Sequence, residues 1–313
     1  MFTSIFTKSK PIIFIIVFVA TILAFLMLQI KQQITAVTPL LIGEVLFGFL
    51  LICFTILLLQ FIVIKNKLSL KSNFEILFFS LFLLLLPEAL LSSKIILANL
   101  FVLLALRRLI SISSNINVQL KLFDAAFYIA LATLCYFWAI VFVLLIFIVL
   151  VFYANNNFKD WFIPFVGLGC VFVLNISASI LWNGDFLGFL NFNYNVDFKY
   201  INYNNPFFLI AFTILFSLGL WASIYFIKNI KLKTRKHRVS FRIVFVSVLL
   251  AFSIVIVSPL KNGSEFLFLF APLAIIKANY IEHNKDKWFK EIFFAVLIFT
   301  PIILLMLYFF TKS

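Results

Sequence analysis

"PIIFIIVFVATILAFLMLQI", residues 11–30, is a run of twenty residues that contains no charged side chain. At about 1.5 Å of rise per residue, a helix of this length spans about 30 Å, the thickness of the hydrocarbon core of a bilayer. The apolar core of a signal peptide is usually shorter, about 7–15 residues, and small residues follow it at a cleavage site. Neither holds here, so the run predicts a retained first membrane helix.

The rest of the chain has the same character. Of its 313 residues, 65% are hydrophobic and 12% are charged, whereas soluble domains are about 45–50% apolar and about 25% charged. A soluble interior is too small for so much apolar surface, so lipid must be the solvent for most of the chain. We interpret the 45 Phe residues as a composition bias. The composition predicts an all-α, polytopic membrane helical bundle, with residues 1–313 forming a single integral membrane domain.

Charged residues divide the chain into eleven apolar segments. About five of them are shorter than a full crossing, so we expect about nine to eleven transmembrane or partly spanning helices. The stretch 123–153 is divided in two because 31 residues at about 1.5 Å each would overshoot the hydrocarbon core; the turn is placed near Tyr136-Phe137-Trp138. The segments are 11–30, 41–64, 74–92, 94–110, 124–138, 139–153, 161–182, 206–227, 242–259, 266–281 and 291–310.

The basic residues indicate an orientation. With the N-terminus placed in the cytoplasm, 20 of the 25 Lys and Arg residues fall on the inner side and 5 on the outer side, as the positive-inside rule expects. The net charge of +14 is therefore interpreted as a topology signal of a multi-pass protein in the bacterial inner membrane, and nucleic acid is not expected as a partner. The longest outside loop is predicted at 183–206. The basic run "KNIKLKTRKHRVSFR", residues 228–242, is predicted to be a cytoplasmic loop that contacts anionic lipid or docks a cytoplasmic partner.

Three carboxylates lie at or just within the predicted outer ends of apolar spans: Glu44, Glu88 and Glu265. Burying an unpaired carboxylate there costs several kcal/mol. One interpretation leaves each at the headgroup level, solvated or near a lysine. The other gathers them around one outward-facing cavity as candidate catalytic groups, with one acting as a general base. Lys94 and Lys261 are then the candidate phosphate-binding residues on that side.

The stretch "LFLLLLPEALLSSK", residues 81–94, predicts the tip of a short hairpin. The two flanking apolar runs are about 24 Å and 18 Å long as helices, so neither comfortably crosses a core of about 30 Å. Short spans that pair in this way tend to be buried in protein and to line cavities. Glu88 is placed at the outer tip of this hairpin.

Several kinds of site are not indicated. The sequence has no Gly-rich phosphate loop, no His-x-x-x-His or Cys-x-x-Cys pair and no Gly-x-Ser-x-Gly elbow. Its three cysteines are isolated within apolar runs. Neither a metal site nor a cofactor is therefore predicted.

Two long stretches carry a family resemblance. "LLALRRLISISSNINVQLKLFDAAFYIALATLCYFWAIVFVLLIFIVLVF" (103–152) and "SEFLFLFAPLAIIKANYIE" (264–282) resemble parts of an uncharacterised multi-pass inner-membrane family of flavobacteria and their relatives. The resemblance covers most of the chain and implies no established activity.

A looser, local resemblance concerns the pair Arg107-Arg108, the apolar double span that follows, and "FLFLFAPLA" (266–274) after Glu265. This arrangement is similar to integral-membrane glycosyltransferases that use polyprenyl-phosphate sugar donors. In that class the active carboxylate lies in the first outside loop. Here that loop, "KQQITAVTPLLIGE" (31–44), has no Asp and offers only Glu44, which puts catalysis in doubt.

Three functions remain open on the sequence. The first is a non-catalytic membrane subunit of a cell-envelope assembly for surface glycan, secretion or motility, whose partners are membrane lipid and other membrane subunits. The second is a glycosyltransferase-like enzyme acting on a polyprenyl-phosphate-linked glycan at the periplasmic face, with Glu44 as base, Glu88 and Glu265 assisting, and Lys94 or Lys261 holding phosphate. The third is a transporter or lipid flippase, which would predict an inverted repeat.

Overall fold

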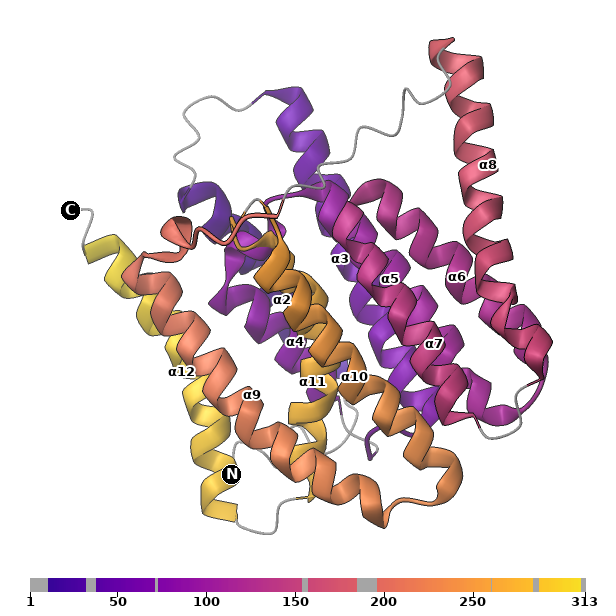
Figure 1. The fold of residues 1–313 in the computed structure, drawn as a ribbon. Coiled ribbons are helices and arrows are strands. Elements are labelled where there is room, and N and C mark those ends of the chain that lie inside the picture. The colour runs from indigo at the N-terminus through magenta and orange to yellow at the C-terminus, as the bar shows by residue number, and fades with distance from the viewer. Residues whose placement is uncertain are drawn as a thin grey trace.

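The computed structural model describes residues 11–31, 38–70, 73–153, 157–184, 196–259, 261–283 and 287–310. Over these residues the chain contains helices and no strand, which confirms the predicted all-α bundle (Figure 1). The α-helices are α2 (Pro11–Lys31), α3 (Pro39–Asn66), α4 (Phe74–Leu85), α5 (Ser93–Ser111), α6 (Val118–Cys135), α7 (Val143–Phe152), α8 (Ile163–Asn183), α9 (Pro206–Leu232), α10 (Arg235–Val257), α11 (Leu267–His283) and α12 (Lys287–Phe310). Six short 3-10 helices join them: η1 (Pro87–Leu90), η2 (Ile112–Ser114), η3 (Phe137–Phe142), η4 (Phe158–Trp161), η5 (Ile201–Tyr203) and η6 (Ser264–Phe266).

Eight helical stretches within the described residues are long and apolar enough to cross a membrane. The protein is therefore a polytopic membrane protein whose outer helix faces contact lipid. The eight stretches are Ile12–Ile30, Pro39–Asn66, Ser93–Ser114, Val118–Cys135, Phe158–Trp182, Pro206–Leu232, His237–Val257 and Ser264–His283.

Local sequence signals set where the helices begin. Pro39 and Pro206 each occupy the first turn, where a missing backbone N–H costs nothing. The residue before each proline caps the helix: Thr38 Oγ1 accepts a hydrogen bond from the Leu41 amide at 3.3 Å, and Asn205 Oδ1 accepts one from the Phe207 amide at 3.0 Å.

Two helices form the centre of the bundle. Every residue from Ser264 to Ile281, which includes most of α11, is buried, and nearly all of α4 is buried as well. The two helices pack against each other through aromatic rings, with the Phe82 and Phe270 ring centroids 5.7 Å apart. α4 ends at Leu85, and Leu86 is non-helical (φ −129°, ψ 76°) because Pro87 follows and the residue before a proline is disfavoured in helical conformation. The short buried span predicted before residue 87 is thus a core helix.

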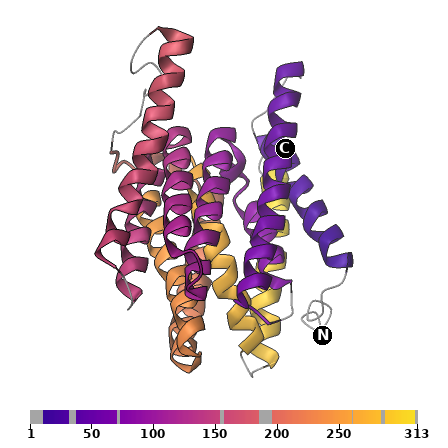
Figure 2. The same ribbon diagram turned by 90° about the vertical axis from the view of Figure 1, so that its right-hand side faces the viewer.

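The predicted break near Tyr136 is confirmed. Tyr136 is extended (φ −150°, ψ 109°) and separates α6 from η3 and α7. α6 also packs closely on α8: a Cβ added at Gly167 would lie 2.7 Å from the Ala126 Cβ and 2.9 Å from the Phe123 carbonyl oxygen. Small residues allow membrane helices to approach in this way. α8 stands at the edge of the bundle and projects beyond its neighbours in both views (Figures 1 and 2).

The structure describes all of the predicted loop 228–242 but only part of the predicted loop 183–206. Within 228–242, α9 continues to Leu232 and α10 begins at Arg235, so most of this run is helical. Arg238 stabilises the junction, because its guanidinium donates to the carbonyl oxygens of Lys231 (3.0 Å) and Lys233 (3.4 Å). Within 183–206, residues 185–195 lie outside the described residues, and 196–205 form an irregular segment that includes η5.

The helices alternate in direction, so the bundle has two ends. The basic end contains the last residues of α3 and α5 and the first residues of α6 and α10, including Lys65, Arg107 and Lys121. The distal end contains η1, η6 and the first residues of α3 and α9, including Glu44, Glu88 and Glu265.

Candidate functional site

The structure brings the segments of Glu88 and Glu265 together at the distal end. η1, which carries Glu88, packs on η6, which carries Glu265. The contact runs through Gly263, where an added Cβ would lie 2.8 Å from the Glu88 Cβ and 3.3 Å from Phe208 Cε2. Gly263 also has φ +95°, which favours glycine. A tight turn therefore seats Glu265 beside the hairpin tip.

The Glu265 carboxyl group is enclosed in protein. Its side chain is 0% exposed, and among the described residues its nearby hydrogen-bond donors are the backbone N–H groups of Gly263 and Glu265, with no side-chain donor. Nearby, the Tyr136 hydroxyl donates to Ser258 Oγ at 2.8 Å, and the Tyr136 ring stacks on Phe268. A buried carboxyl group without a charged partner costs several kcal/mol, which marks Glu265 as a functional candidate.

Glu44 lies at the same end but in a different cavity. This cavity has a volume of about 120 Å³ and is formed by α2, α3 and the segment from η1 into α5. Gln29 and Ser93 are its other polar lining residues, and Glu44 itself is exposed. The cavity is not lined by Glu88 or Glu265. The three carboxylates therefore share an end of the bundle without sharing one described cavity, and their catalytic role stays a prediction.

The two candidate phosphate-binding lysines have different surroundings. Lys94 is exposed at the start of α5. Lys261 is 1% exposed, and its Nζ donates to the carbonyl oxygens of Val255 (2.9 Å) and Ile256 at the end of α10. Burial lowers the pKa of Lys261, and the nearby Asp197 carboxylate partly offsets this. In this conformation Lys261 caps a helix, a position that also favours a cation because of the helix dipole.

An aromatic groove lies beside the Glu265 segment at the distal end. It has a volume of about 630 Å³ and opens between α9 and α10. The Tyr203 ring stacks on Phe208 at 4.5 Å, and Phe208 meets Phe266 edge-on at 5.6 Å. Phe266 directly follows Glu265, so the backbone of the Glu265 segment adjoins the groove wall. The lining residues are Tyr200, Ile201, Tyr203, Asn204, Phe208, Leu209, Phe212, Phe252, Val255, Ile256 and Phe266.

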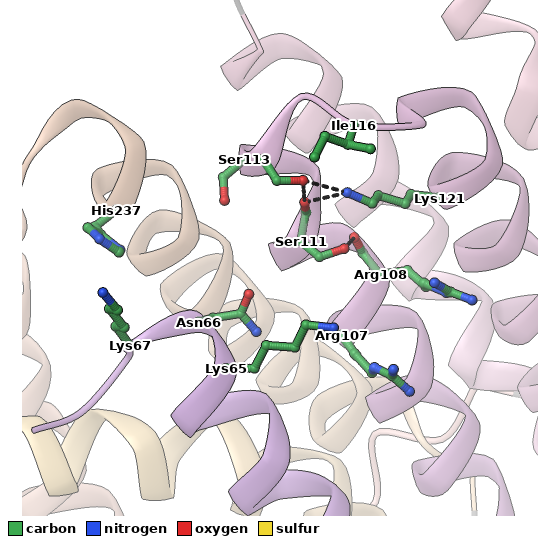
Figure 3. Close-up of a pocket in the computed structure, with 11 residues that line it drawn as sticks. Lys65, Asn66, Lys67, Arg107, Arg108, Ser111, Ser113, Ile116, Lys121 and His237 are labelled. Atoms are coloured by element: carbon green, nitrogen blue, oxygen red, sulfur yellow. Dashed lines mark hydrogen bonds between the residues drawn. The ribbon is translucent and has the colours of Figure 1, made fainter. Parts of the chain in front are cut away.

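A second pocket, the basic pocket, lies at the basic end of the bundle; Figure 3 shows its lining residues. It has a volume of about 410 Å³, and five of its lining residues are Lys or Arg. The sequence indicates these residues as markers of topology, and the pair Arg107-Arg108 also as part of the local resemblance, but it does not predict that they line one pocket. The lining residues are Lys65, Asn66, Lys67, Arg107, Arg108, Ser111, Ser113, Ser114, Ile116, Lys121 and His237.

Among the described residues, no group of three or more His, Cys, Asp or Glu side chains could hold a metal ion. Comparison with known proteins finds no matching family model, no matching curated protein and no matching solved structure. The two resemblances drawn from the sequence therefore stay predictions.

Proposed function

We propose that this polytopic membrane protein binds the hydrocarbon chain of a membrane lipid in the aromatic groove and serves as a non-catalytic, lipid-binding subunit of a bacterial cell-envelope assembly. The observation that carries the proposal is the groove itself, a cavity of about 630 Å³ between two helices long enough to cross a membrane.

The position of the groove favours a lipid as its occupant. Leu209 on α9 is 45% exposed and Ile256 on α10 is 37% exposed, and both line the groove. Their outer surroundings are lipid, because α9 and α10 are apolar membrane spans. A hydrocarbon chain can thus enter the groove sideways without crossing water.

Shape selects the occupant. Within a bilayer, burying apolar surface gives no net driving force, because lipid tails are as apolar as the protein. Affinity must come from close packing and dispersion against the rings of Phe208, Phe212 and Phe252.

The rim of the groove offers polar groups at headgroup level. The Tyr203 hydroxyl is buried and has no hydrogen-bond partner among the described residues. Asn204 lies beside it on the rim, and the Lys261 ammonium lies 4.5 Å from the Tyr200 ring centroid. Tyr203 and Asn204 are suited to orient the polar end of a lipid whose chain occupies the groove, whereas Lys261 is engaged in its contacts with the end of α10.

Native mass spectrometry of the protein in mild detergent tests this function. The wild-type protein is expected to retain a bound lipid and to co-purify with a membrane partner. Leu209→Trp narrows the groove and is expected to lose the lipid. Leu220→Trp is the matched control, because Leu220 is 51% exposed on the same helix and does not line the groove. Equal lipid retention in the two variants would refute groove binding, and purification without a partner would count against the subunit role.

The second candidate function is the glycosyltransferase-like enzyme. One observation favours it: Glu88 and Glu265 lie on adjoining 3-10 helices beside the groove, where the phosphate end of a polyprenyl-linked donor would sit. Because Glu265 is enclosed in this conformation, catalysis would require the turn at Gly263 to open. The transporter or flippase hypothesis stays a prediction.

A further inference from the structure

We propose that the basic pocket is a binding site for a phosphate-bearing ligand. This site is at the opposite end of the bundle from the aromatic groove, so the inference is independent of the proposed function.

The pocket gathers positive charge from separate elements (Figure 3). Lys65 and Lys67 come from the end of α3, Arg107 and Arg108 from the end of α5, and Lys121 from the start of α6. A topology signal alone requires only that these residues lie on one side of the membrane. It does not require them to line one cavity.

The charge is largely uncompensated within the cavity. No acidic residue appears among the described lining residues. Asp124, outside the lining, pairs with Arg108 through an Nη2–Oδ2 distance of 3.0 Å. Concentrating like charges in one concave site raises its electrostatic potential and favours entry of an anion.

Several of the cations are held in place before a ligand arrives. Lys121 Nζ donates to the Ser111 carbonyl oxygen at 2.8 Å and to Ser114 Oγ at 2.7 Å, leaving its third N–H for a ligand. The Arg107 guanidinium lies 4.6 Å from the centroid of the Phe61 ring. Less side-chain entropy is then lost on binding.

The wall of the pocket is a rigid turn. The hydroxyls of Ser111, Ser113 and Ser114 donate to the carbonyl oxygens of Arg108, Ile110 and Ser111 respectively. The Tyr153 hydroxyl fastens the same turn by donating to the Ile112 carbonyl oxygen at 2.6 Å. These contacts use the hydroxyl donors, so the ligand contacts fall to the guanidinium and ammonium groups.

This donor set matches phosphate. Guanidinium groups bind phosphate oxygens in pairs, and ammonium groups add point charges. A volume of about 410 Å³ lies within the usual range for small-molecule sites, about 300–1,000 Å³, so a diphosphate fits as well as one phosphate group. The phosphate can belong to a lipid headgroup or to a soluble compound, because the pocket lies where the spans end.

Calorimetry with inorganic pyrophosphate tests the site on the full-length protein in neutral detergent. We expect saturable binding that weakens as salt rises. Arg107→Gln removes one charge-assisted contact, commonly about 1.5–3 kcal/mol, so affinity should fall roughly 10–100-fold. Lys231→Gln is the matched control, since it removes one charge from an exposed residue near the basic end and outside the pocket; it should change affinity less than about twofold.

A second arm distinguishes the two sources of phosphate. Thermal unfolding is compared in phosphatidylglycerol and phosphatidylcholine nanodiscs. The site is assigned to a lipid headgroup if phosphatidylglycerol stabilises the protein and pyrophosphate does not bind. This stabilisation should then be lost in Arg107→Gln and kept in Lys231→Gln. Absence of both effects in the wild-type protein overturns the proposal without relying on any variant.

Discussion

The Cα of Gly263 faces the side chain of Glu88 so closely that a Cβ at position 263 would lie 2.8 Å from the Glu88 Cβ. This contact joins the hairpin tip after α4 to the turn before α11. It is the reason that two carboxylates far apart in the sequence lie at one place in the fold.

Gly263→Ala should therefore destabilise the protein by about 1–3 kcal/mol, because the new Cβ meets Glu88 and the residue must keep a positive φ. Thermal unfolding in detergent measures the effect. Gly184→Ala is the control, since Gly184 also has a positive φ (+70°) but open space around it. If both variants lose the same stability, the contact with Glu88 contributes nothing.

Gly167→Ala should loosen the packing of α8 on α6, because its Cβ would approach Ala126 at 2.7 Å. We expect a loss of about 1–3 kcal/mol, as is common when a tight interface is overpacked. Gly169→Ala lies on the same helix with no atom near its added Cβ and should leave stability unchanged or slightly higher. A protease-protection assay and thermal unfolding together report the difference. Equal behaviour of the two variants would show that α8 is not held by this contact.

The sequence predicts the helices better than it predicts their contacts. The break at Pro87 could be predicted because a proline ends a helix locally. The break at Tyr136 could be predicted because the apolar segment around it is too long for one crossing of the bilayer. Most of the run 228–242 is helical where a loop was expected, and Arg238 holds the junction of α9 and α10 by donating to the carbonyl oxygens of Lys231 and Lys233. These two hydrogen bonds depend on a tight turn between α9 and α10, which the distribution of Lys and Arg along the sequence does not reveal.

For the candidate sites too, the sequence predicts the side of the membrane better than the contacts between residues. The sequence placed Glu44, Glu88 and Glu265 on one side, but only the fold shows that Glu88 adjoins the Glu265 segment while Glu44 lines another cavity. The aromatic groove was missed because the Phe residues were interpreted as a composition bias. The basic pocket was missed because the charge pattern assigns each lysine only to one side of the membrane. Which helices are neighbours in the membrane plane, here α3, α5 and α6, depends on their packing.

Lys261→Met should lower stability by roughly 1–3 kcal/mol, since a charged donor to two carbonyl groups at the end of α10 is lost. Lys199→Met removes an exposed charge from the neighbouring segment and should have little effect. Thermal unfolding compares them. Unchanged stability of Lys261→Met together with weaker lipid retention would contradict the structural role and support phosphate binding by Lys261.

Glu265→Gln and Glu44→Gln should leave the envelope glycan unchanged at normal protein level, because the proposed subunit performs no acid–base chemistry. Glycan analysis of strains expressing each variant, with immunoblotting for protein level, provides the measurement. Loss of the glycan in a stably expressed Glu265→Gln strain would instead favour the enzyme.

The most direct measurement is an experimental density map of the protein in lipid nanodiscs. Lipid binding in the groove predicts elongated density against Phe208, Phe212 and Phe252, with its polar end near Tyr203 and Asn204. An empty or closed groove, in a map that resolves annular lipids elsewhere on the bundle, would contradict the proposed function.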